Sequence, residues 1–439
     1  MLDLIRDLLP RFEDPNPGYV GWTLIIIASA FWCVTWFYLA AHNLYQITIA
    51  LFGIRKKPET KILTPEKRFA IIVPAHNEDK VIGETISSLK AMEYPDELYE
   101  IFVIADNCSD DTAANARVAG ATVLERWNDE KRGKPFAFEW GFYEIEASGK
   151  HFDGIVTIDA DNVVSANLLT EFNSRLLKGE TVIQAYLDTK NPNDNWITWA
   201  YAMAFWLAAR TYQLARYQLG LPCALGGTGF CIEISVLRKY GWDVTSLTDD
   251  LEYTMRVLLN GIKPTWAHDA VIYDEKPLTM RASMRQRMRW MQGHWDVAHR
   301  YFMPLLRKAI RDRDFAALDG AIYCIAPTRV LLWSLTLALA WMPYFFPQVL
   351  FFLPDVGLWL GVAVIAFYII YPGIYLMLER VPWKYLLRYI IVIPVFGLTW
   401  IPITWLGYFR RRRKHWDKTD HTRSLSIDEV ETKKRASAP

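Results

Sequence analysis

The sequence is poor in cysteine and carries almost no net charge, and each of these features argues against certain classes of protein. Its 5 cysteines form no CxxC pair and show no metal-ligand spacing, so we expect reduced, cytoplasmic thiols. Lys and Arg number 49 against 48 Asp and Glu, and a formal net charge of +1 gives no general case for binding nucleic acid. The chain also lacks GxGxxG and P-loop motifs, which argues against a dinucleotide enzyme or an ATPase.

Apolar residues are abundant instead. They make up 52% of the 439 residues, too much for one ordinary soluble domain, and this length leaves room for two or three domains. Most of the 19 tryptophans fall in or beside apolar stretches, as is typical of residues at a membrane interface. We therefore expect a membrane protein with a separate polar domain.

The first apolar stretch, residues 20–54, follows a short N-terminal segment (1–19). It is too long for a signal-peptide core and lacks a basic n-region, which predicts an uncleaved transmembrane anchor. A basic cluster after it places the exit of the anchor in the cytoplasm. This cluster consists of Arg55, Lys56, Lys57, Lys61, Lys67 and Arg68.

Residues 301–409 are predicted to form interfacial and transmembrane helices, and residues 410–439 a basic cytoplasmic tail. The three apolar stretches are 327–347, 349–377 and 386–409. Three full spans would leave the basic tail outside, against the positive-inside rule. Because Pro394 and Pro402 interrupt the last stretch, we predict a re-entrant or interfacial hairpin there, buried in protein.

Residues 65–300 alternate apolar runs with helical patterns, which predicts a mostly parallel, doubly wound α/β sheet. The predicted strands are 69–73, 99–105, 121–124, 154–158 and 181–185. Polar residues follow these strands directly, at the sheet edge where open α/β folds bind ligands. Within this domain, the apolar but arginine-containing segment 193–220 is predicted to hold amphipathic helices lying on the bilayer surface.

Two carboxylates, Asp159 and Asp161, directly follow the predicted buried strand 154–158. Burying two acids costs several kcal/mol unless a cation or another partner neutralises them. Mg²⁺ or Mn²⁺ fits this pattern, because such ions are held by one or two carboxylates together with phosphate oxygens. A solvated Asp-Ala-Asp turn is the alternative that the tripeptide alone leaves open.

Other polar groups support a ligand site, and each has a plainer alternative. Asp106 ends the second strand and could equally cap a helix. The glycines of 226–229 suit either close approach of a ligand or an ordinary turn. Asp249 and Asp250 could serve as a general base or simply favour a helix N-terminus.

The basic stretch 284–295 has the pattern of a helix that could bind phosphate. Gln286 and Arg289 are three residues apart and therefore neighbours on a helix surface. A guanidinium binds phosphate oxygens two at a time, although lipid headgroups could be the ligand as well as a nucleotide.

Together these motifs resemble the membrane-bound family 2 glycosyltransferases, the group of bacterial cellulose, chitin and hyaluronan synthases and related exopolysaccharide synthases. The matching motifs, in the family's order, are Asp106, Asp159-Ala160-Asp161, Thr248-Asp249-Asp250 and Gln286-Arg287-Met288-Arg289-Trp290. The resemblance covers about residues 65–300 and is nearest to exopolysaccharide-type members. Thr-Asp-Asp stands where cellulose synthases have Thr-Glu-Asp.

The resemblance implies a GT-A catalytic domain, a nucleotide-sugar donor that is most often UDP-linked, and Mg²⁺ or Mn²⁺. Asp250 would be the catalytic base, with Asp249 as the second candidate, and Asp161 and Asp159 would serve the metal. Gly227, Thr228 and Trp290 would bind the acceptor. The donor site would comprise Ala75, His76, Glu78, Asp106, Lys134, Asp159, Gln286, Arg287 and Arg289.

The implied reaction is a single inverting displacement that extends a β-linked polysaccharide at the inner membrane, with the catalytic domain in the cytoplasm. The family associates the Gln-Arg-Met-Arg-Trp motif with processive members. Single addition to a lipid or polyprenyl-linked acceptor is the main alternative, and a non-catalytic nucleotide-sugar sensor is another. Expected partners are the donor, a polysaccharide or glycolipid acceptor and membrane lipids, but not nucleic acid. Four membrane elements are few for a wide channel, which leaves room for a homo-oligomer or an export partner.

Overall fold

The computed structural model describes residues 18–56, 62–339, 370–381, 383–412, 425–430 and 432. The chain divides into two compact units. One comprises Met1–Thr48 and Ala326–Ile374, and the other Ile49–Ile325 and Tyr375–Pro439.

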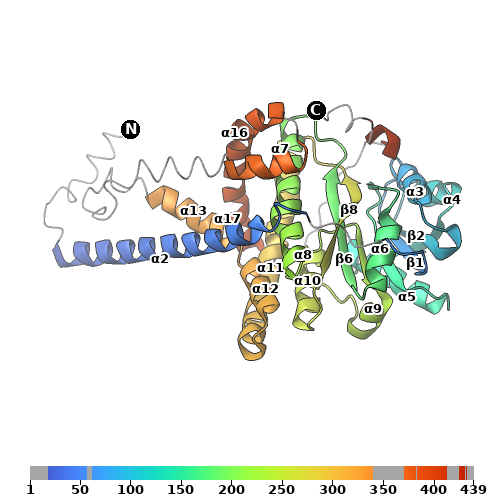
Figure 1. Ribbon diagram of the computed structural model, residues 1–439, viewed down its shortest axis with the longest axis horizontal. Coiled ribbons are helices and arrows are strands. Elements are labelled where there is room, and N and C mark those ends of the chain that lie inside the picture. Colours follow the sequence, from blue (N-terminus) through green and yellow to red (C-terminus); the bar gives the residue numbers. More distant parts are fainter. Residues whose placement is uncertain are drawn as a thin grey trace. The chain divides into compact units, whose positions relative to one another are not determined.

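Two helices represent the first unit. Helix α2 (Gly18–Leu51) has 34 residues and contains no Asp, Glu, Lys or Arg, and its last residues belong to the second unit. Helix α13 (Thr328–Leu339) packs beside it through Trp36 and Trp333, whose ring centroids lie 5.9 Å apart. The Tyr38 and Thr328 hydroxyls are 2.8 Å apart. The apolar stretch predicted at 20–54 is thus helical over most of its length (Figure 1), and its crossing of a membrane stays a prediction.

The second unit is built on an eight-stranded sheet with the order β3-β2-β1-β4-β7-β6-β8-β5. The strands are β1 (Phe69–Ala75), β2 (Tyr99–Asp106), β3 (Thr122–Arg126), β4 (Gly154–Thr157), β5 (Val163–Val164), β6 (Val182–Thr189), β7 (Phe230–Glu233) and β8 (Thr265–Asp274). All five predicted strands are confirmed as β1, β2, β3, β4 and β6. The sheet is mixed, because β7 runs antiparallel to both its neighbours and β5 antiparallel to β8.

Helices cover both faces of this sheet, as the doubly wound pattern predicts. The alternation of β1 shows this directly: Ile71 and Val73 pack on one face, and Ala70 and Ile72 on the other. The first face is covered by α3 (Ile82–Lys90), α4 (Thr112–Val118) and α6 (Leu168–Leu177). The second is covered by α5 (Lys134–Ala147), α9 (Ile234–Tyr240) and α10 (Asp249–Leu259), and the short helix η2 (Asp96–Leu98) leads into β2.

The segment predicted to lie on a bilayer surface is largely enclosed by protein. It forms α7 (Trp196–Ala208), a π-helical turn η3 (Ala209–Leu214) and α8 (Ala215–Leu219), and every residue from Ile197 to Met203 is buried. Contact of the rest of this segment with a bilayer surface stays a prediction. Its arginines are buried as well and form ion pairs, Arg210 with Glu379 and Arg216 with Asp319.

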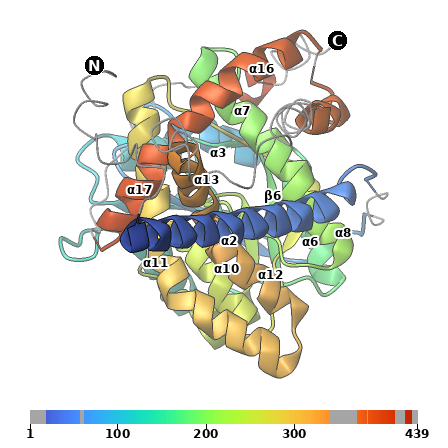
Figure 2. The ribbon, with the colours of Figure 1, turned by 90° about the vertical axis from the view of Figure 1, so that its left-hand side faces the viewer.

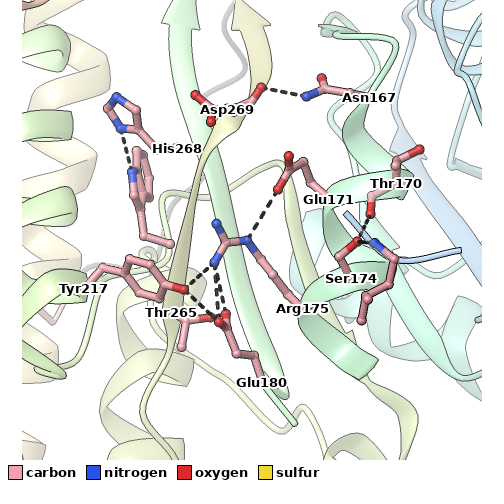
Figure 3. Close-up of polar contacts among 12 residues, drawn as sticks. Asn167, Thr170, Glu171, Ser174, Arg175, Glu180, Tyr217, Thr265, His268 and Asp269 are labelled. Atoms are coloured by element: carbon pink, nitrogen blue, oxygen red, sulfur yellow. Dashed lines mark hydrogen bonds and ion pairs between the residues drawn. The ribbon is translucent and has the colours of Figure 1, made fainter. Parts of the chain in front are cut away.

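A third buried arginine connects α8 to the sheet through hydrogen bonds and an ion pair (Figure 3). Arg175 of α6 donates to the Tyr217 hydroxyl at 2.7 Å and pairs with Glu180. Thr265, the first residue of β8, donates to the same Glu180 carboxylate. Because each group bonds at least two others, the end of the 196–219 segment is held at one place on the sheet.

The remaining described helices follow the sheet: α11 (Met280–Asp312), α12 (Phe315–Cys324), α16 (Trp383–Leu398) and α17 (Trp400–Arg410). Helix α16 leads into α17 without turning back (Figure 2), so the predicted hairpin is wrong. Proline lacks an N–H but does not force a reversal, and the chain continues helically past both prolines. Most of the predicted stretch 349–377 lies outside the described residues.

Within the described chain, one helical run, Tyr385–Arg410, is long and apolar enough to cross a membrane. A second would qualify if the interrupted pair Phe315–Cys324 and Thr328–Thr336 formed one span. Part of the predicted basic tail is docked rather than free: Leu425, Ile427 and Val430 pack against Val163 and Tyr273 at the β5 edge of the sheet.

Candidate active site

The two aspartates after β4 lie beneath the glycine-containing loop before β7. The Asp159 backbone N–H donates to the Thr228 hydroxyl at 3.0 Å. That hydroxyl in turn donates to Asn162 Oδ1 at 2.7 Å. Gly227 has φ +88°, a conformation that glycine adopts without strain. The structure therefore brings the predicted donor-side aspartates and the predicted acceptor loop together.

Lys134, at the start of α5, connects these two segments. Its ammonium donates to Asp159 Oδ1 and to the Gly227 carbonyl oxygen. Burial by itself lowers the pKa of Lys134, but the nearby Asp159, Asp249 and Asp250 carboxylates raise it overall. Lys134 is therefore a cation with several acids around it, and it lies next to both the aspartate pair and the predicted base.

Asp249 and Asp250 begin α10, close to the loop. A Cβ added to Gly227 would lie 3.5 Å from Asp250 Oδ2, an ordinary van der Waals contact, so the glycine loop and this carboxylate are direct neighbours. Burial and the neighbouring Asp249 charge raise the pKa of Asp250 to about 7. Burial also raises the pKa of Asp249. Thr248 occupies the N-cap position but makes no capping bond with its side chain.

A divalent cation fits this site only if the donor supplies part of its ligand shell. Among the described residues, no group of three or more His, Cys, Asp or Glu side chains could hold a metal alone. Asp159 and Asp161 offer hard carboxylate oxygens, the type that Mg²⁺ and Mn²⁺ prefer, and these ions commonly complete their shell with phosphate oxygens. The pair therefore suits a metal that arrives with a diphosphate.

The residues predicted to hold the nucleoside gather where β1 and β2 end. The His76 ring lies 2.7 Å from the Asp106 carbonyl oxygen, and the Gly133 N–H donates to Asp106 Oδ2 at 3.3 Å. Ala75 is buried, and the Glu78 N–H donates to the Thr112 hydroxyl at 2.7 Å. The Asp106 side chain itself is buried in an ion pair with Arg126.

Helix α11 brings part of the basic motif to the acid pair. The positive charge of Arg289 acts to lower the pKa of Asp250, against the larger effects of burial and the Asp249 charge. Gln286 Oε1 is buried and has no hydrogen-bond partner among the described residues. The Trp290 ring packs edge-on against Tyr201, with centroids 6.1 Å apart.

Arg287 has different surroundings, and its contacts argue against the predicted place in the donor site. It is fully buried, and Nη1 donates to the Thr399 hydroxyl at 2.8 Å. Its guanidinium lies 4.2 Å from the Phe396 ring centroid. Residues two positions apart point about 200° apart around a helix, so Arg287 and Arg289 lie on nearly opposite sides of α11.

Sequence reasoning missed three polar partners of the site. Asn162 and Lys190 both bind Asp161, through the Asn162 amide at 3.1 Å to Oδ1 and the Lys190 ammonium to the backbone carbonyl. Arg126 pairs with Asp106. Asn162 adjoins the aspartate pair and could have been found, but Lys190 and Arg126 reach the site only through strand pairing.

A doubly covered mixed sheet with acids at the ends of its strands is the GT-A glycosyltransferase fold. The structure matches a mannosyltransferase from Pyrobaculum calidifontis, solved with GDP-Man and Mn²⁺, at a TM-score of 0.55 and 19% identity. The match covers 85% of this chain and 99% of that one.

The family model described as glycosyltransferase like family 2 matches residues 65–293, and the chain belongs to this family. A probable glycosyltransferase of Bacillus subtilis is 28% identical over 262 residues, which is 55% of this chain and 60% of that protein. A poly-β-1,6-N-acetyl-D-glucosamine synthase of Staphylococcus epidermidis is 24% identical over 287 residues, covering 62% and 67%. The chain thus spans about three fifths of the first of these relatives.

Proposed function

We propose that the protein transfers a sugar from a nucleotide-sugar, UDP-linked in the first instance, to a growing β-linked polysaccharide, with inversion. The observation that carries this proposal is the meeting of Asp250, Lys134 and Asp159 around Gly227. The similarity to a poly-β-1,6-N-acetyl-D-glucosamine synthase supports a polymer as the acceptor.

Asp250 takes the proton of the attacking acceptor hydroxyl. The hydroxyl oxygen forms a bond to the anomeric carbon as the bond from that carbon to the diphosphate breaks. A base works best when its pKa is near the working pH, and burial next to Asp249 brings the pKa of Asp250 to about 7. One displacement inverts the anomeric configuration, so an α-linked donor gives a β-linked product.

The departing diphosphate gains negative charge, and the positive charges of Lys134 and Arg289 neutralise it. Asp159 and Asp161 would hold a divalent metal, which would supply further positive charge for the leaving group. Before the donor binds, Lys134 occupies Asp159. It therefore has to exchange this carboxylate for the diphosphate, a movement that the flexible four-carbon lysine side chain allows.

The other residues bind rather than react. Ala75, His76, Glu78 and Asp106 receive the nucleoside at the β1 and β2 ends. Gly227, Thr228 and Trp290 bind the acceptor. Gln286 belongs to the donor site, where its buried oxygen, which has no partner among the described residues, can accept a bond from a donor hydroxyl.

The test is to incubate the purified full-length protein with a panel of UDP-sugars and Mg²⁺ or Mn²⁺, then measure nucleotide release and product size. We expect one donor to support release and to yield a polymer, and excess EDTA to stop it. A product with one added sugar would replace the polymer with single addition. Donor binding without release, in the presence of every acceptor tried, would make the protein a sensor and reject the enzyme.

A further inference from the structure

Arg287 is fully buried, and burial of a guanidinium is costly unless other groups compensate its charge. Within the described residues, no carboxylate forms an ion pair with it. Its bonds go to the Thr399 hydroxyl at 2.8 Å and the Ser283 carbonyl at 3.4 Å. The rings of Phe396 and Trp400 lie 4.2 and 5.0 Å away, so cation–π attraction stands in for an acid.

These partners surround one point, the interruption between α16 and α17. Helix α16 ends at Leu398 and α17 begins at Trp400, with Thr399 between them. The Thr399 hydroxyl donates its own hydrogen to the Phe396 carbonyl at 2.6 Å, which leaves a lone pair to accept from Arg287. Arg287 therefore binds where the apolar run Tyr385–Arg410 is interrupted.

The same apolar run contacts α11 further along. A Cβ on Gly407 would come within 2.6 Å of the Met291 Cβ, so the two helices touch closely there. The Trp295 indole N–H donates to the Thr404 carbonyl at 3.2 Å. Both contacts lie C-terminal to Arg287 on α11 and C-terminal to Thr399 on α17, so the two helices stay in contact beyond the Arg287–Thr399 bond.

Trp290 belongs to the same packed group. Its ring contacts Tyr201, and the Tyr201 ring lies 5.3 Å from Phe396, the ring beneath the Arg287 guanidinium. The Tyr201 hydroxyl is 3.1 Å from the Ser283 hydroxyl on α11. A shift of the Phe396 region would therefore reach Trp290 through a single intervening ring.

We propose that Arg287 is a positioning residue that locks the register of α11 on the interrupted apolar helix and thereby places Trp290 for the acceptor. Arg287 touches neither donor nor acceptor. The role of Trp290 in this inference rests on the proposed function. The positioning of α11 by the Arg287–Thr399 bond does not depend on any activity.

The test compares Arg287→Met, Thr399→Val and the double variant with Arg281→Met, an exposed arginine two turns earlier on α11. Hydrogen exchange of amides 399–404 should be roughly tenfold faster in each single variant, because one charged hydrogen bond is lost. The double variant should be no faster than the singles, since both remove the same bond. Arg281→Met should match the wild type, and Arg287→Lys should restore part of the protection.

UDP binding and acceptor extension provide a second test. Affinity for the probe UDP with Mn²⁺ should stay within about twofold, while acceptor extension falls roughly 10- to 100-fold, the scale of a small misplacement. Loss of UDP affinity equal to that in Arg289→Ala would return Arg287 to the donor site. Additive exchange effects would also overturn the proposal. If the wild type releases no nucleotide, the proposed function is rejected. The exchange data still test whether the Arg287–Thr399 bond holds α11 in place.

Discussion

The proposed chemistry gives Asp250 and Arg289 different tasks. Asp250→Asn keeps the shape of the side chain and removes its basicity. We expect affinity for the donor to change little and transfer to fall by roughly 10²–10⁴-fold. Arg289→Ala removes a charge from the leaving-group side, so both affinity and transfer should fall. Calorimetry with UDP beside nucleotide-release assays distinguishes the two, and equal loss of UDP affinity in both variants would assign Asp250 to the donor site.

The pH dependence of transfer follows from the same carboxylate. A base must be deprotonated, and burial with the Asp249 charge raises the pKa of Asp250 to about 7. Hence kcat/KM should fall as the pH drops below about 7, because the protonated fraction of Asp250 grows. Asp249→Asn removes a like charge, so the acidic limb should move to lower pH whatever activity remains. An unchanged limb in that variant would argue against Asp250 as the titrating base.

The surroundings of Arg287 could not be predicted from its residue type. Its place in the basic motif predicted a diphosphate contact, yet its partner is Thr399, 112 residues away in the sequence. Arginines 287 and 289 are indistinguishable by charge and spacing alone, and only the packing of α11 decides which of them faces the acids. Local sequence does not contain that information.

At the scale of elements, the position of the base depends on the crossing of α10 and α11 at Gly293. A Cβ on Gly293 would lie 2.5 Å from the Thr248 hydroxyl oxygen and 2.7 Å from its backbone nitrogen. Gly293→Ala should push the start of α10 away and reduce transfer by roughly 10²-fold with little change in UDP affinity. Gly83→Ala on α3, where nothing lies within 4 Å, is the control. Equal activity of both variants would show that α10 tolerates displacement.

Prediction of the elements succeeded where the pattern is local. The run 69–73 is continuously apolar because β1 is covered on both faces, and the sequence reveals such strands readily. Strand β7 has four residues, and β8 has an irregularity in register opposite Ala185 and Tyr186. Neither gives a clean pattern, so both were missed, together with the antiparallel pairings that make the sheet mixed.

For the whole molecule, attachment to a membrane remains a prediction, supported by α2 and by the run Tyr385–Arg410. If both insert, the protein should stay with membranes washed in alkaline carbonate and be released by detergent, because about 20 apolar residues suffice to span a bilayer. A variant with Leu387, Ile391 and Val395 replaced by Glu changes exposed positions of α16 and should weaken retention. Wild-type protein found in the carbonate supernatant would contradict insertion.

The docked segment 425–430 has a consequence for how the protein is made. Strand β5 leaves the ribosome long before Leu425, Ile427 and Val430, which later pack against it and Tyr273. At usual rates of translation this interval is on the order of tens of seconds. During that time the newly made sheet has an uncovered apolar edge, the kind of surface that captures other chains. Slower expression at low temperature, with chaperones in excess, should therefore improve the yield of intact protein.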